Sequence, residues 1–351
     1  MLRNEIYRII DANTNRASEA LRILEEWTRF IKEDSEVLQK LKNIRHKINS
    51  TFTNIQSLVF NRESINDIGR NTDNPSKRTC LRDVLMANCK RLEEALRVLS
   101  EYSKAIGIDA TYLEDSRYEI YTIEKELLQH EKLIRLKTSS LYLVTNRDGF
   151  NSDADFFTII EKAIEGGVDI IQLREKNETE KRILEIAEGI KRLIANTNIL
   201  FIVNDRVDIA LACDADGVHL GQDDLPVQEA RKITPYSFII GLSTHSIKQG
   251  QNSLLSSADY IGVGPVFETP TKPDYNAVGL EYVKWANDNI KQLPWFAIGG
   301  INEINIKDVI NTGAKKVALV RAIMNSKNPY KATKQIKEYL TESTKLHAQT
   351  K

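Results

Sequence analysis

The sequence has few cysteines, no excess of charge and no long apolar run, and each absence excludes a class of protein. Its 351 residues hold three cysteines, Cys80, Cys89 and Cys213, an odd number without CxxC spacing. We therefore expect buried reduced thiols instead of a disulfide framework or a cysteine-bound metal. The formal net charge is zero, which argues against a general binder of nucleic acid or membrane surfaces.

Two further absences concern membranes and nucleotides. No apolar run is long enough to span a bilayer, and the N-terminus lacks the apolar core of a signal peptide, so a cytoplasmic protein is expected. No GxxxxGK[ST] pattern occurs, which excludes a P-loop nucleotide site. A chain of 351 residues exceeds the usual single domain and favours one large domain with a smaller one.

Residues 1–137 are expected to form a helical domain. They contain a single proline, Pro75, and apolar side chains at helical spacing. The stretch Ala12–Trp27 is repeated at Ala87–Tyr102, so that Arg16 aligns with Arg91. The simplest account is two related helical hairpins packed as a four-helix unit. The repeated polar residues either pair along exposed helix faces, which the residues alone favour, or line a pocket where the two arginines face an anion.

From about Ser140, short runs rich in strand-forming residues alternate with helix-length segments. Eight such units in about 200 residues fit a (β/α)8 barrel better than a doubly wound sheet. The fold class is therefore α/β, a barrel domain at 138–351 preceded by the all-α domain at 1–137. The expected strands are Leu141–Thr145, Asp169–Leu173, Ile199–Val203, Gly217–Leu220, Phe238–Leu242, Tyr260–Val263, Trp295–Ile298 and Val317–Val320.

Polar residues at the ends of these strands predict a site for anions. Because side chains alternate along a strand, Gln172 and Arg174 share the inward face, and Lys176 follows in the loop. An amide and two cations suit the charge and geometry of a diphosphate. Glu175 lies among them, so a solvated charged loop is the alternative.

The next two strand ends supply Asn204, Asp205, His219 and Asp224. Carboxylates from neighbouring strand ends suit Mg²⁺ shared with phosphate oxygens. Asn204 or Asp205, taken alone, is as typical of the N-cap of the next helix. His219 fits a packing role as well as a chemical one.

The remaining strand ends are small and polar, and they predict room for a second anion. Gly262 and Gly264 leave volume in the barrel mouth, and Gly300, followed by an expected helix from Asn302, offers backbone N–H groups to a phosphate. Together with Thr269–Lys272 and Arg321, they suggest a transferase that joins two phosphorylated small molecules.

These motifs resemble one known family. They are QLREK at Gln172–Lys176, VND at Val203–Asp205, GVHLGQDD at Gly217–Asp224, GLSTH at Gly241–His245, GVGPVFETPTK at Gly262–Lys272 and AIGGI at Ala297–Ile301. In this order and at these strand ends they resemble thiamine-phosphate synthase. The resemblance implies Mg²⁺-dependent joining of a hydroxymethylpyrimidine diphosphate to a hydroxyethylthiazole phosphate. Departure of diphosphate would leave a pyrimidine-methyl cation, which the thiazole nitrogen captures without losing a proton.

The resemblance also implies a role for each matching residue. The metal ligands would be Asp205 and Asp224. The catalytic residues would be Arg174, Lys176, Ser243 and Lys272. The substrate-binding residues would be Gln172, Leu173, Arg174, Glu175, Lys176, Asn204, Ser243, Thr269, Pro270, Thr271, Lys272, Gly300, Val320 and Arg321. Of these, Thr269–Thr271, Gly300, Val320 and Arg321 would hold the thiazole phosphate.

The repeats DANTNRASEALRILEEW and MANCKRLEEALRVLSEY resemble the helical domain fused ahead of some thiamine-phosphate synthases. That resemblance implies phosphorylation of the pyrimidine monophosphate, with ATP as a further partner. Two alternatives stay open, a barrel of the thiazole tautomerase type and an N-terminal unit that only binds or assembles. Assembly as a homo-oligomer is also open.

Overall fold

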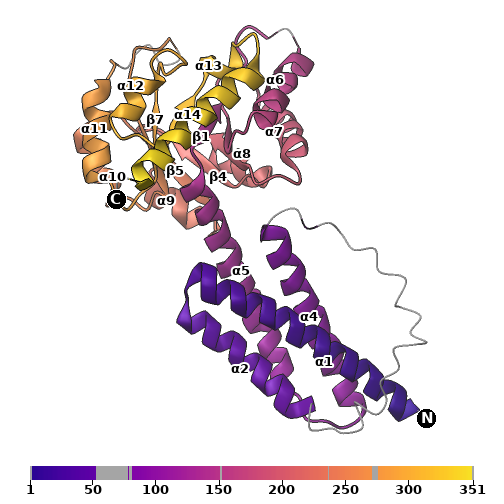
Figure 1. Cartoon of the computed structure of the whole chain (residues 1–351). Helices are drawn as coiled ribbons and strands as arrows, with labels where there is room; N and C mark the ends of the chain where they lie inside the picture. Colours follow the sequence, from indigo (N-terminus) through magenta and orange to yellow (C-terminus); the bar gives the residue numbers. More distant parts are fainter. Residues whose placement is uncertain are drawn as a thin grey trace. The chain divides into compact units, whose positions relative to one another are not determined.

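The computed structural model describes residues 2–52, 78, 81–150, 152–235, 237–270 and 276–349. These residues form two compact units, Met1–Glu131 and Lys132–Lys351 (Figure 1). Helix α5 (Tyr112–Thr138) begins in the first unit and ends in the second, whereas the sequence places the boundary after residue 137. None of the described helices is long and apolar enough to cross a membrane.

In its described residues the first unit is all-α, as predicted. Helix α1 (Leu2–Trp27) continues into the π-helical turn η1 (Thr28–Lys32), and α2 (Ser35–Phe52) returns along it. Helix α4 (Leu81–Ala105) carries the second copy of the repeat and packs against α1, which carries the first. The polar connection at 61–79 lies, except for Arg78, outside the described residues. The repeated helices therefore form the centre of this unit.

The second unit is the predicted closed barrel. All eight strands are parallel, each pairs with the next along the chain, and β8 pairs with β1. A parallel strand requires a crossover before the next one, and helices supply it. The strands are β1 (Leu141–Val144), β2 (Ile170–Leu173), β3 (Leu200–Asn204), β4 (Gly217–Leu220), β5 (Ile239–Thr244), β6 (Tyr260–Val263), β7 (Trp295–Ile298) and β8 (Val317–Leu319).

Helices cover the outside of the barrel (Figure 1). Three of them begin with a side-chain cap, since Ser152, Thr179 and Ser246 accept a backbone N–H in the first turn of α6, α7 and α10. The helices are α6 (Asp153–Glu165), α7 (Glu180–Ile194), α8 (Val207–Ala212), α9 (Val227–Ile233), α10 (Ile247–Ser253), α11 (Gly279–Asn289), α12 (Ile306–Asn311), α13 (Arg321–Met324) and α14 (Pro329–Gln349).

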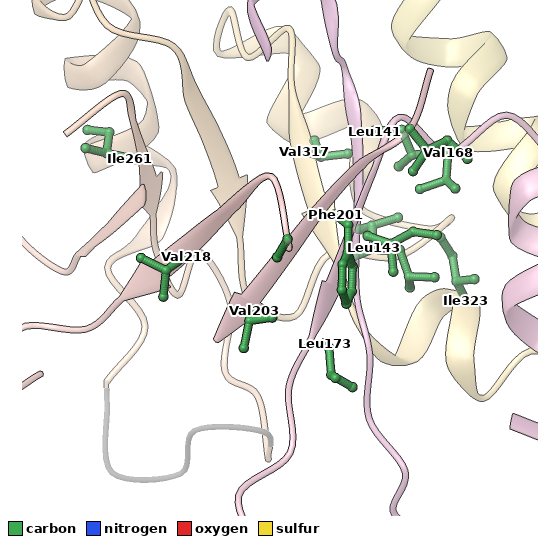
Figure 2. Packing of buried hydrophobic residues seen from close by; sticks show 14 of the residues in the cluster. Leu141, Leu143, Val168, Leu173, Phe201, Val203, Val218, Ile261, Val317 and Ile323 are labelled. Atoms are coloured by element: carbon green, nitrogen blue, oxygen red, sulfur yellow. The ribbon is translucent and has the colours of Figure 1, made fainter. Parts of the chain in front are cut away.

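Alternation along the strands divides the apolar residues into two layers. One layer packs between strands and helices, and Figure 2 shows part of it, including Leu143, Leu173 and Phe201. The other fills the barrel interior and includes Tyr142, Tyr260 and Phe296. This alternation decides which strand residues can reach a ligand.

The amino ends of the strands form the closed end of the barrel. Leu136, near the end of α5, is fully buried in the interior cluster. Asp216, just before β4, accepts the backbone N–H of Phe201 at 3.0 Å and lies 3.0 Å from the Lys132 ammonium. Burial alone would raise the pKa of Asp216, but the charges of Lys132 and Arg135 outweigh it and lower that pKa. The last turns of α5 thus belong structurally to the barrel.

Candidate active site

A cavity of about 860 Å³ lies in the mouth of the barrel, lined by residues at and after the carboxyl ends of the strands. Active sites of this fold occur at that end. The cavity brings together eleven of the residues expected from the sequence. They are Gln172, Arg174, Lys176, Asn204, Asp205, Asp224, Ser243, Thr269, Gly300, Val320 and Arg321.

The other expected residues are placed differently. Leu173 is buried in the layer between strands and helices, so its side chain lies on the face of β2 away from the cavity (Figure 2). Glu175 and Pro270 are not among the described lining residues. Thr271 and Lys272 lie outside the described residues. A role for Leu173 in ligand binding would therefore involve its backbone.

The end of β2 presents an amide and two cations, as the alternation predicts. Gln172 is buried and its amide Nε2 donates to the Tyr142 hydroxyl at 2.8 Å. Arg174 follows on the same face, with its backbone N–H donating to the Thr145 hydroxyl at 3.1 Å. The Lys176 side chain is 51% exposed, and its ammonium lies 3.9 Å from an Asp205 oxygen. Positive charge therefore lines this side of the cavity.

Asp205 has a special backbone conformation at the end of β3. Its φ of 61° lies in the left-handed region, which aspartate adopts more readily than most residues. Its backbone N–H donates to the carbonyl of His219 on the neighbouring strand at 2.8 Å. Asp224 accepts the backbone N–H of Gly221 at 2.6 Å, which closes the turn after β4. Both carboxylates line the cavity.

The opposite side of the cavity lacks side-chain volume. Gly299 and Gly300 have φ of 103° and 66°, a conformation favouring glycine. A Cβ at Gly264 would approach the Ile298 carbonyl oxygen to 2.0 Å. The chain therefore requires glycine here for its backbone as well as for ligand space.

The helix expected from Asn302 begins instead at Ile306, so this prediction is wrong. Asn302 Oδ1 accepts the backbone N–H of Ile304 at 2.9 Å, and Asn305 Nδ2 donates to the Gly300 carbonyl at 2.9 Å. An asparagine side chain that bonds its own backbone stabilises a turn in competition with a helix. Gly300 thus lies in a turn, and it lines the cavity together with Val320 and Arg321.

Comparison with known proteins decides the family. Residues 141–323 match the family described as thiamine monophosphate synthase, and residues 8–126 match the ThiD2 family. The thiamine-phosphate synthase of Nostoc punctiforme is 42% identical over 94% of this chain and 93% of its own length. That of Synechocystis sp. is 42% identical over 97% of both chains. The chain belongs to the thiamine-phosphate synthase family.

A solved structure agrees for the barrel. Thiamine phosphate pyrophosphorylase from Pyrococcus furiosus is 36% identical, with a TM-score of 0.54 over 60% of this chain and 98% of its own. The chain is therefore a transferase of thiamine biosynthesis, and the thiamine-phosphate synthase resemblance of its strand-end motifs is confirmed.

The sequence did not identify two tyrosines in the cavity lining as candidate site residues. Tyr142 and Tyr260 are buried on the interior face, and their hydroxyls lie 2.8 Å apart. The ring nitrogens of His219 contact the Tyr260 hydroxyl at 3.0 Å and the Ser243 hydroxyl at 2.9 Å. The signal in the sequence was a tyrosine at an inward-facing position of each of two strands, β1 and β6.

Glu175 has an unusual environment beside the cavity. Its Oε1 is buried and has no hydrogen-bond partner among the described residues. Burial raises the pKa of Glu175 to about 7, which the nearby Arg147 guanidinium only partly opposes. A carboxyl group with this pKa changes charge near neutrality, as groups at functional sites often do.

The first unit places its repeated polar residues in two environments. Asn13 and Asn88 are buried, and each side-chain amide donates to the carbonyl four residues earlier, at 2.8 and 2.7 Å. Their role is therefore structural. Arg16 and Arg91 are exposed on α1 and α4, where an anion could reach them.

Proposed function

We propose that the barrel joins a pyrimidine carrying a methylene diphosphate to a thiazole carrying a phosphate, releasing diphosphate. The observation that carries the proposal is one cavity lined both by the cationic end of β2 and by Gly300 with Arg321. Arg174 and Lys176 supply charge on one side, and the backbone of Gly300 with Arg321 supplies the other. A phosphate on each substrate would orient the two rings toward each other in the mouth of the barrel.

The donors in the cavity fit Mg²⁺ as the metal. Asp205 and Asp224 are hard oxygen ligands, and no cluster of three or more metal-binding side chains occurs in the described ranges. Mg²⁺ commonly takes one or two carboxylates and completes its shell with water and substrate phosphates. Bound by these two aspartates and the diphosphate, it would neutralise negative charge on the leaving group.

The residues of the chain would act by binding and charge. The bond between the methylene carbon and the diphosphate oxygen breaks, and the thiazole nitrogen forms the new bond to that carbon. Arg174 and Lys176 would stabilise the charge that develops on the diphosphate as the bond lengthens. The attacking nitrogen carries no proton, so the reaction requires no general base at the nucleophile.

The test uses the purified full-length protein with both substrates, with and without Mg²⁺, and measures thiamine phosphate and diphosphate. We expect one diphosphate per thiamine phosphate, and loss of both products on chelation. Metal-independent conversion of the thiazole substrate alone, without the pyrimidine, would instead assign the barrel to the tautomerase class.

We propose further that the first unit phosphorylates the pyrimidine monophosphate with ATP and so supplies the barrel's substrate. Its match to a second family and the exposed, repeated arginines Arg16 and Arg91 support this. The full chain and a fragment of residues 132–351 are each given pyrimidine monophosphate, thiazole phosphate, ATP and Mg²⁺. The proposal is supported if the full chain forms thiamine phosphate and the fragment does not. If neither protein forms it from the monophosphate, the first unit would be a binding or assembly module.

A further inference from the structure

Five side chains of the cavity lining form a continuous hydrogen-bonded chain through the barrel interior. The chain runs from Gln172 through the hydroxyls of Tyr142 and Tyr260 to His219 and then Ser243, with distances of 2.8, 2.8, 3.0 and 2.9 Å. The five residues come from β2, β1, β6, β4 and β5. They thus connect strands on different sides of the barrel.

Each hydroxyl in such a chain has one proton to donate, so the first donor fixes the direction of the rest. Tyr142 and Tyr260 are 2% and 1% exposed, and burial raises the pKa of both phenols, so both keep their protons. A buried hydroxyl proton without an acceptor costs about 1–3 kcal/mol. Every proton in the chain is therefore expected to have an acceptor.

The direction follows from Gln172. Its amide N–H donates to the Tyr142 oxygen, so the Tyr142 proton must go to its remaining described partner, the Tyr260 oxygen. The Tyr260 proton then goes to His219 Nδ1. With Nδ1 as acceptor, the imidazole carries its proton on Nε2 and donates to Ser243 Oγ.

We propose that His219 is a positioning residue in the Nε2–H form, which holds Ser243 Oγ as acceptor and so directs the serine's own proton into the cavity. Ser243 lines that cavity. The serine would donate to an acceptor atom of the substrate, a role that rests on the proposed function. The same direction excludes His219 as a base toward Ser243, because its Nε2 already carries a proton. His219 and Ser243 are therefore not a base and a nucleophile, although their side chains lie within hydrogen-bond distance.

The direction of donation along the hydrogen-bonded chain is measured by nitrogen NMR of the full-length protein with ¹⁵N-labelled histidine. The five histidines are assigned by the signals missing in a His219→Gln variant. We expect His219 Nδ1 to be unprotonated and Nε2 protonated in the wild-type protein. The opposite tautomer would mean that the chain runs from Ser243 to Gln172, and it would overturn the proposal without any other variant having to fold.

A Tyr260→Phe variant tests the positioning role. Loss of the donor to Nδ1 should mix the two tautomers and lower kcat/KM by about tenfold, the effect expected for one misdirected hydrogen bond. The matched control is Tyr282→Phe, which removes another buried tyrosine hydroxyl, bonded to Thr244 at 2.7 Å outside the chain. It should leave the His219 signals and kcat/KM unchanged.

Unchanged His219 signals and unchanged kcat/KM in Tyr260→Phe would overturn the positioning role. These outcomes differ from failure of the proposed function. In that case the wild-type protein would form no thiamine phosphate, whereas the histidine spectrum would still report the direction of the chain.

Discussion

The two ends of the barrel use similar charged residues in opposite ways. At the amino end, aspartates before β2, β4 and β6 accept backbone N–H groups and pair with cations from the covering helices. They are Asp169 with Lys337, Asp216 with Lys132, and Asp259 with Arg231. At the mouth, charged side chains line a cavity. The amino end thus uses its charges to hold the chain together, and the mouth directs its charges at a ligand.

Two carboxyl groups show the difference most clearly. The pKa of Asp216 is lowered because the charges of Lys132 and Arg135 outweigh its burial. The pKa of Glu175, beside the mouth, is raised because burial outweighs its partly compensating neighbours. A charged Asp216 therefore stabilises the fold, and a charged Glu175 destabilises it.

The largest expected effect comes from removing the end of α5. A fragment of residues 139–351 loses Leu136 from the interior cluster and leaves Asp216 without Lys132 and Arg135. A lost core leucine and a broken partly buried ion pair together cost about 5 kcal/mol or more. Urea unfolding should show this fragment largely unfolded, whereas residues 132–351 retain a cooperative transition. Equal stability of the two fragments would show that α5 contributes nothing to the amino end.

The next effect is on catalysis at the mouth. Asp205→Asn preserves side-chain size and tolerates the left-handed backbone, so it removes only the charge. If Asp205 is a metal ligand, kcat/KM should fall about 10³-fold, which is about 4 kcal/mol. The melting temperature should change little. Asp208→Asn, an exposed aspartate on α8 paired with Arg206, is the control and should leave turnover unchanged. Full activity in Asp205→Asn would contradict the metal role.

A smaller effect is expected from Asp216→Asn at the amino end. The variant should lose about 2 kcal/mol of stability at pH 7 with unchanged kcat. Because the folded pKa lies below the unfolded one, this stabilisation is full above pH 4 and is lost as the pH falls through the folded pKa. Urea titrations at pH 7 and at a pH well below the ordinary pKa of 3.8 measure the difference. The control is Asp214→Asn, at a side chain that is 90% exposed. It should leave the free energy of unfolding unchanged at both pH values.

The barrel and most of its mouth were predictable from the sequence because both follow local patterns. Short runs of strand-forming residues between helix-length segments predicted the strands, and β4, β6 and β7 have the predicted bounds. The inward face of β2 followed from alternation once Gln172 was placed inside. The predicted start of α12 was wrong for a reason that is also local. The Asn302 side chain accepts the backbone N–H of Ile304 and stabilises a turn in place of the first helical turn.

Properties that depend on several strands could not be read from the sequence. The contact between Tyr142 and Tyr260 requires residues from β1 and β6 to meet across the interior, a distance set by barrel closure. The left-handed backbone at Asp205 depends on its bond to His219. The burial of Glu175 depends on neighbours that follow Thr145 as well as on its own loop. Charge in the sequence therefore indicated a site but not which carboxyl group carries an altered pKa.

The smallest expected effect comes from Glu175→Gln and has the opposite sign. The folded pKa of about 7 exceeds the ordinary 4.5, so between these values the folded state holds more protons, and its stability falls as the pH rises. Allowing for solvent screening, the variant should exceed the wild type by about 1 kcal/mol at pH 8 and match it near pH 4.5. Urea unfolding at both pH values tests this, with exposed Glu188→Gln as the control. A wild type that is the more stable at pH 8 would mean that Arg147 holds Glu175 charged, and Glu175 would then resemble Asp216.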